Sequence, residues 1–163
     1  MKILSMKTTI FLGAMLSLLV CLMFTGCSNS ETNSTSRGLT DFAHIEEEYL
    51  ATIDSLNWPD GITLPDKLED EDTGASFQVG YGETRASYLW EYSWMKEWLD
   101  TYNTDPERAE KALEELEKAF DMPYMGKDMC DDATRNYLRE NIDKAKLGDP
   151  SGFTESIRAN YAN

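Results

Sequence analysis

The chain has 163 residues, of which 15 are basic and 30 are acidic, and its formal net charge at pH 7 is −15. A protein this negative repels phosphate backbones and anionic headgroups, which argues against nucleic acid as a partner. Three cysteines and one histidine leave little material for disulfides or for a histidine-based zinc site.

The first 27 residues are predominantly apolar and carry two charges, both from lysines. Lys2 and Lys7 come first, residues 8–26 carry no charge, and the segment closes on Thr25-Gly26-Cys27. This pattern resembles the signal peptide and lipobox of bacterial lipoproteins, in which small residues precede a cysteine that is diacylated before cleavage. The alternative is an uncleaved transmembrane anchor, because an uncharged run of this length approaches the roughly 20 residues that span a bilayer.

The resemblance implies that residues 1–26 are removed as a signal peptide and that Cys27 becomes the lipidated N-terminus. The membrane is then the first partner, and the remaining chain is extracytoplasmic. It is held at the outer face of the plasma membrane, or at the outer membrane if the cell has two. Lys2 and Lys7 are the only charged residues before Cys27, so the exported part has a net charge of −17.

Residues 27–38 form the next segment. Residues 28–38 have no aliphatic or aromatic side chain and are mostly serine, threonine and asparagine. Such a composition has nothing to bury and predicts a flexible tether. With Cys27 acylated and Cys21 removed with the signal, Cys130 is the only free thiol, so stability has to come from packing.

Residues 39–163 have the length of one domain, and their periodicity predicts an all-α fold. We expect a compact bundle of about five helices around a central aromatic helix at residues 84–102. The first helix spans residues 40–57 and ends at the turn containing Pro59 and Gly61. An irregular loop at residues 61–82 follows, with a short piece at residues 76–79 that is extended in this prediction.

The central helix carries more apolar surface than a surface helix tolerates. Its predicted stripe steps by three and four residues, and three tryptophans lie beside it. The stripe is Tyr88, Tyr92, Met95, Leu99 and Tyr102, and the tryptophans are Trp90, Trp94 and Trp98. The face left for water is predicted to hold Ala86, Leu89, Ser93, Lys96, Glu97 and Asp100.

Three further helices complete the bundle. Thr104-Asp105-Pro106-Glu107 is a capping box that opens the third helix. The fourth runs from about Asp131 to Leu147 and stops at Gly148. The last starts at Asp149-Pro150 and places Phe153, Ile157 and Tyr161 on one side.

The loop at residues 61–82 is the first candidate site. It carries the acidic run Glu69, Asp70, Glu71 and Asp72, and loops on a rigid scaffold are where binding residues gather. We predict a mobile element that meets a cationic partner: a basic protein or other cell-envelope component, a polyamine or a divalent ion. The alternative is a solvated acidic loop without a partner.

A second candidate is a cluster of soft donors. Met122, Met125, Met129 and Cys130 place four sulfur atoms within nine residues, and thioether and thiolate ligands select copper(I). Methionine also fills gaps in irregular cores, and packing is the favoured interpretation. We therefore assign no metal and no cofactor, and keep these four residues as the alternative ligand set for copper(I).

Three other patterns have a functional and a structural interpretation. The tryptophan line is an aromatic platform for a sugar or a core. His44 and Glu48 have the spacing of half a zinc site or are surface residues. Gly80-Tyr81-Gly82 is a turn that presents N–H groups to a phosphate or a tight turn. In each case we favour the structural interpretation.

Motifs for catalysis are scarce in this chain, which has no GxSxG and no second histidine. We expect a lipid-anchored, non-catalytic binding domain. The alternatives are an extracytoplasmic enzyme with a carboxylate pair, such as a cell-wall or glycan hydrolase, and a copper-binding lipoprotein.

Overall fold

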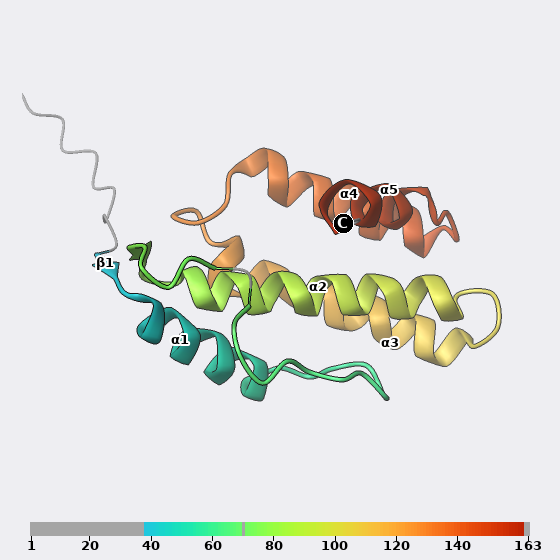
Figure 1. Cartoon of the computed structure of the whole chain (residues 1–163). Coiled ribbons are helices and arrows are strands. Elements are labelled where there is room, and N and C mark those ends of the chain that lie inside the picture. Colours follow the sequence, from blue (N-terminus) through green and yellow to red (C-terminus); the bar gives the residue numbers. More distant parts are fainter. Residues whose placement is uncertain (1–37, 70, 162–163) are drawn as a thin grey trace, which may run out of the picture. The chain divides into compact units, whose positions relative to one another are not determined.

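Five α-helices make up most of the chain that the computed structural model describes, residues 38–69 and 71–161 (Figure 1). The elements in chain order are β1 (Leu39–Thr40), α1 (Phe42–Ser55), β2 (Phe77–Gln78), α2 (Tyr81–Thr101), α3 (Pro106–Glu117), the 3-10 helices η1 (Lys118–Asp121) and η2 (Pro123–Met125), α4 (Asp132–Lys146) and α5 (Ser151–Asn160). The predicted helical fold is confirmed. The predicted signal peptide, Cys27, the tether up to residue 37 and Asp70 lie outside the described residues.

Helix α2 is the element against which the others pack. It contacts α1 and α3 along much of its length, and it also contacts α5 and η2. In Figure 1, α1 lies on one side of α2 and the α4–α5 pair on the other. The prediction of a central helix is correct, but α2 begins at Tyr81, three residues earlier than predicted, because Gly80 adopts a left-handed φ of 91° as its N-cap.

A two-stranded antiparallel sheet closes the loop between α1 and α2. Leu39 pairs with Gln78 and Thr40 with Phe77, and the Val79 N–H donates to the Gly38 carbonyl at 3.0 Å. The extended piece predicted at residues 76–79 is therefore real, but its pairing with the start of the domain was not predicted. The sheet holds the end of the loop against the entry to α1.

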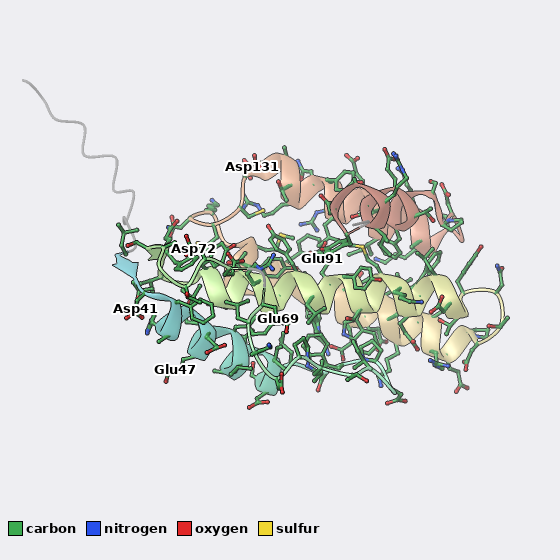
Figure 2. The ribbon with its side chains drawn as sticks, in the orientation of Figure 1. Asp41, Glu47, Glu69, Asp72, Glu91 and Asp131 are labelled. Atoms are coloured by element: carbon green, nitrogen blue, oxygen red, sulfur yellow. The ribbon has the colours of Figure 1, made fainter. Side chains whose placement is uncertain are left out.

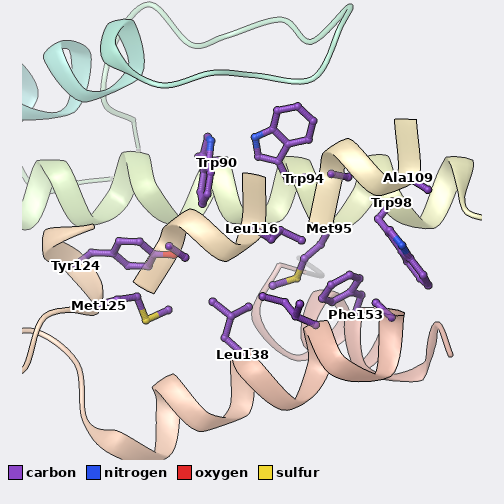
Figure 3. Packing of buried hydrophobic residues seen from close by; sticks show 14 residues of the cluster. Trp90, Trp94, Met95, Trp98, Ala109, Leu116, Tyr124, Met125, Leu138 and Phe153 are labelled. Atoms are coloured by element: carbon purple, nitrogen blue, oxygen red, sulfur yellow. The ribbon is translucent and has the colours of Figure 1, made fainter. Parts of the chain in front are cut away.

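Two hydrophobic clusters form the core. The larger lies between α2, α3, η2, α4 and α5 and contains Trp90, Trp94 and Trp98, each no more than 2% exposed (Figure 3). The smaller packs α1 against α2 and the loop, and consists of Ile45, Tyr49, Ile53, Leu68, Phe77 and Ala86. Burial of the tryptophan line confirms the core interpretation and rules out the exposed sugar platform.

The buried face of α2 is centred on the tryptophans rather than on the predicted stripe. Tyr88 is 40% exposed, and Tyr92, Leu99 and Tyr102 are half-buried. Ala86 and Ser93, which we placed on the water face, are buried. The prediction was wrong because α2 is covered from several sides, so even its small residues meet a neighbouring element.

Two of the tryptophans are fixed by one backbone acceptor. The indole N–H groups of Trp90 and Trp94 donate to the Asn57 carbonyl at 2.8 and 3.1 Å. Buried indole nitrogens usually find such a partner. The chain leaving α1 is thereby tied to the middle of α2.

The predicted ends of α3 and α4 are close to those observed. Asp105 accepts from the Arg108 N–H and caps α3, so the cap lies one residue after Thr104. Asp131 accepts from the Thr134 N–H and caps α4. Gly148, with a φ of 79°, follows α4, as the predicted stop requires. In the part of the chain described, we find no helix long and apolar enough to span a membrane.

Candidate functional site

A cavity of about 350 Å³ opens between α2, α4, α5 and η2. Its walls are largely aromatic and aliphatic, with a few polar groups. Its lining residues are Arg85, Tyr88, Glu91, Met125, Thr134, Tyr137, Leu138, Ser156, Asn160 and Tyr161. We call it the tyrosine pocket. An apolar concave site with a small number of converging polar groups is the usual form of a small-molecule site.

Glu91 is the buried charge of the tyrosine pocket. Glu91 is 7% exposed, and it lies on the side of α2 that faces the α4–α5 pair (Figure 2). The Tyr124 hydroxyl donates to Glu91 Oε2 at 2.8 Å. Burial raises the pKa of the Glu91 carboxyl to about 7, although the hydrogen bond from Tyr124 acts in the opposite direction.

Three tyrosines surround the opening above Glu91. Tyr88 and Tyr137 are each 40% exposed, and the Tyr161 hydroxyl donates to the Tyr88 carbonyl at 3.3 Å. Tyr161 also packs on Tyr92 with ring centroids 4.9 Å apart. Burial raises the pKa of both Tyr88 and Tyr161, and the neighbouring Glu91 adds to each shift. The Tyr88 and Tyr161 phenols are therefore neutral hydrogen-bonding groups at physiological pH.

The positive charge of Arg85, at the edge of the pocket, is already paired. Its Nε lies 3.2 Å from Glu71 Oε1, and the Tyr81 hydroxyl donates to the same oxygen at 2.8 Å. The Glu71 side chain is only 13% exposed. One member of the predicted acidic run thus serves as counter-ion to Arg85.

The other described members of the run have different partners. Glu69 pairs with Lys67 at 2.9 Å, with both side chains more than half exposed. Asp72 accepts from the Gly74 N–H within its own turn, and Figure 2 shows it apart from Glu69. Among the described residues, no three histidine, cysteine or acidic side chains are grouped as a metal site. The structure does not bring Glu69, Glu71 and Asp72 together.

A second cavity, of about 280 Å³, lies beside the loop. Pro65, Lys67, Leu68 and Glu69 line it from the loop side. Arg85, Tyr88 and Tyr161 line both this cavity and the tyrosine pocket. The predicted binding loop and the tyrosine pocket are therefore neighbours that share a wall.

The sulfur cluster is only partly assembled. Cys130 Sγ lies 3.6 Å from Met125 Sδ, and Met125 is buried in the main core. Met122 packs on the same core, and Met129 is half-buried. Burial raises the pKa of the Cys130 thiol, which keeps it protonated and a poorer metal ligand than a thiolate. Met125 and Cys130 are the pair that the structure brings together.

The glycine turn at the start of α2 does bind an anion, and that anion is part of the protein. Glu48 accepts from the Gly80 N–H at 2.8 and 3.0 Å and from the Gly82 N–H at 3.1 Å. His44 Nε2 lies 3.3 Å from Glu48 Oε1. A carboxylate at a helix N-terminus interacts favourably with the helix dipole. Glu48 therefore fixes the crossing of α1 and α2.

A larger cavity, of about 540 Å³, lies between α2, α3 and the end of α4. Trp98, Tyr102 and Leu113 contribute apolar surface, and three glutamates and Lys146 line it as well. Lys146 pairs with Glu117 across α3 and α4. This cavity is more exposed to solvent, and its acidic residues lie at its surface rather than in its interior.

Comparison with protein families, with curated proteins and with solved structures finds no match to this chain. The site therefore has to be judged on its own geometry.

Sequence reasoning missed Glu91, although a signal was present. Ser87, Glu91, Trp94 and Trp98 follow one another at helical spacing, so a glutamate occupies the middle of the buried face of α2. An acidic residue inside an apolar stripe is rarely buried without a partner or a role. The stripe drawn through Tyr88, Tyr92 and Met95 hid this residue because it was centred on the wrong face.

Proposed function

We propose that this chain is a lipid-anchored extracytoplasmic protein whose helical domain is a non-catalytic binding module, with the tyrosine pocket as its ligand site. The anchor is Cys27, supported by the charge-free run that ends at Thr25-Gly26-Cys27. The observation that carries the binding site is a buried carboxyl at the base of an aromatic cavity.

The burial of Glu91 supports a role in binding because it costs stability. A carboxyl in an apolar environment is disfavoured in its charged form, and its pKa of about 7 reflects that cost. Titratable groups whose pKa values are shifted in this way are often found at functional sites. Within residues 38–69 and 71–161, Tyr124 is the one hydrogen-bond partner of the Glu91 carboxyl, which leaves acceptor capacity for a ligand.

The binding site is tested by methyl NMR on the full-length chain in mild detergent, with methionine methyl groups labelled. The Met125 methyl reports from the tyrosine pocket, and Met95, which is fully buried, is the internal reference. We expect a ligand from a screen of metabolites and cell-wall fragments to shift Met125 and not Met95. Tyr137→Ala should weaken binding, whereas Leu147→Ala, on a residue 88% exposed, should not. A ligand that binds without shifting the Met125 methyl resonance would show that the binding site lies elsewhere in the protein.

The anchor is tested by labelling cells with an alkyne fatty acid. We expect the wild-type chain to be labelled and to lose 26 residues. Cys27→Ala should abolish both changes, and Cys130→Ala, the matched control, should leave them intact. An unprocessed wild-type chain without an acyl group would overturn the anchor and favour the transmembrane alternative.

The contact between Met125 and Cys130 supports copper(I) binding as a second candidate function. Two sulfur atoms 3.6 Å apart are close enough for one soft ion to reach both. The test is competition for copper(I) against a chromophoric chelator under reducing conditions. Cys130→Ser should weaken binding, and the same affinity in wild type and variant would remove this candidate.

A further inference from the structure

We infer that the ligand of the tyrosine pocket is a small organic cation carrying a primary ammonium group, which binds Glu91 while its carbon chain packs on the tyrosine rings. This inference rests on the proposed binding function. It goes further by fixing the charge and the donor pattern of the ligand.

The charge of the pocket requires a cation. Two charged side chains line it, Arg85 and Glu91. Arg85 has its counter-ion in Glu71, at 3.2 Å. Among the residues that the structure describes, the Glu91 carboxyl has one hydrogen-bond partner, the neutral Tyr124 hydroxyl at 2.8 Å. A bound cation would supply the missing counter-charge, whereas an anion would face an unbalanced carboxylate in a site of low dielectric.

The polar groups beside Glu91 match a primary ammonium. Ser156 is 3% exposed and lines the pocket, and a serine hydroxyl carries two acceptor lone pairs. Asn160 donates its amide N–H to the Ser156 carbonyl at 3.0 Å, which leaves its side-chain oxygen as an acceptor. An ammonium group has three N–H donors. Glu91, Ser156 and Asn160 all line the pocket, and each carries an oxygen that can accept from an ammonium N–H, whereas a quaternary ammonium has no N–H to donate.

The aromatic walls suit the same ligand. Tyr88, Tyr137 and Tyr161 line the opening, and the face of an aromatic ring attracts a nearby cation. The volume of about 350 Å³ is at the lower end of the range for small-molecule sites, about 300–1,000 Å³. The pocket therefore fits a short aliphatic amine better than a large ligand.

Ionisation of Glu91 makes the affinity depend on pH. The groups facing it are Tyr88, Tyr124, Tyr161 and Cys130, each with a raised pKa. Because the pKa values of these four groups are raised from ordinary values of 9 or more, it is Glu91 that changes charge between pH 6 and 8. With the Glu91 pKa at about 7, the apparent Kd for an amine should be about tenfold higher at pH 6 than at pH 8.

The test titrates four probes of equal chain length into the full-length chain: n-butylamine, butyltrimethylammonium, 1-butanol and butyrate. The Met125 methyl resonance reports occupancy. We expect n-butylamine to bind at least tenfold more tightly than the other three and to show the tenfold pH effect. Glu91→Gln should reduce n-butylamine to the affinity of 1-butanol and remove the pH effect. Ser156→Ala should weaken binding but keep the pH effect. Glu110→Gln, the same change in the larger cavity, should alter neither.

The outcomes separate this inference from the proposed function. If 1-butanol or butyrate binds as tightly as n-butylamine, the ligand class is wrong and the binding function stands. Tighter binding of butyltrimethylammonium would exclude the primary ammonium. Unchanged n-butylamine affinity in Glu91→Gln would remove Glu91 from the site. If none of the four probes shifts Met125, the inference is overturned, whereas the pocket as a ligand site is overturned only if the screen of metabolites and cell-wall fragments also leaves Met125 unshifted.

Discussion

Replacing Glu91 by glutamine should stabilise the protein at neutral and alkaline pH. The substitution keeps the side-chain volume and an oxygen for the Tyr124 hydroxyl, which lies 2.8 Å from the carboxyl. It removes only the charge. Because Glu91 is almost fully buried, the cost of ionising it in the folded protein is not screened by water.

The sign and size of the effect follow from proton linkage. The Glu91 pKa is about 7 in the folded protein, against an ordinary value of 4.5. Between these two pH values the folded state binds more protons than the unfolded state, so stability falls as pH rises. The stability that the protonated Glu91 carboxyl contributes is fully present below pH 4.5 and is lost as the pH rises through 7. At about 1.4 kcal/mol per pH unit, the loss amounts to about 3 kcal/mol.

The assay is urea unfolding of wild type and Glu91→Gln from pH 4 to pH 8.5, followed by tryptophan fluorescence. We expect the free energies of unfolding to be nearly equal at pH 4. At pH 8 the variant should be more stable by about 3 kcal/mol, or by about 10 °C in Tm for a domain of this size.

The matched control is Glu115→Gln, which changes another buried glutamate. Lys118 lies 2.7 Å from Glu115, so this variant loses an ion pair and should be no more stable than wild type at pH 8. A stability difference between wild type and Glu91→Gln that does not change from pH 5 to pH 8 would refute the reasoning.

Four further variants test the packing of α2, each by chemical denaturation. Trp94 is 1% exposed, so Trp94→Ala should lower the free energy of unfolding by about 3–5 kcal/mol. Leu99 is half-buried, so Leu99→Ala should lower it by only about 1–2 kcal/mol. Equal losses in the two variants would contradict the observed burial. Gly82→Ala would place a methyl group 1.8 Å from the Ile45 carbonyl oxygen, so it should destabilise by about 1–3 kcal/mol or more, and a neutral result would show that α1 and α2 separate easily. Glu48→Gln should cost about 1 kcal/mol, and a loss that high salt leaves unchanged would show that the charge of Glu48 is not what matters.

The helices were predictable because their signals are local. Capping aspartates at residues 105 and 131 and the glycine at residue 148 lie within a few positions of the ends they define. The hydrophobic periodicity of α2 was strong enough to identify it as the central helix. Its start was placed too late because the left-handed N-cap, Gly80, receives its carboxylate from Glu48 in α1 rather than from a neighbouring residue.

The candidate site was not predictable because its parts are distant in sequence. Glu91 meets Tyr124, which lies 33 positions away, and Tyr161 reaches Tyr88 across 73 positions. No spacing rule links such residues. The acidic run at residues 69–72 attracted the functional prediction by its density of charge, yet a single carboxylate in an apolar setting is the more unusual feature. Among the described members of the acidic run, Glu71 connects the run to the tyrosine pocket by pairing with Arg85.

The hydrogen bonds that fix Trp90 and Trp94 have a consequence for how this sequence can change over evolutionary time. Both indoles donate to the carbonyl of residue 57 rather than to its side chain. Any amino acid at position 57 presents the same carbonyl, so this position can vary while both bonds persist. The constraint falls on the two tryptophans, since replacing either with a residue that lacks a donor removes a bond. A sequence survey for this contact between residue 57 and α2 should search for two tryptophans four positions apart, and should not require a particular amino acid at position 57.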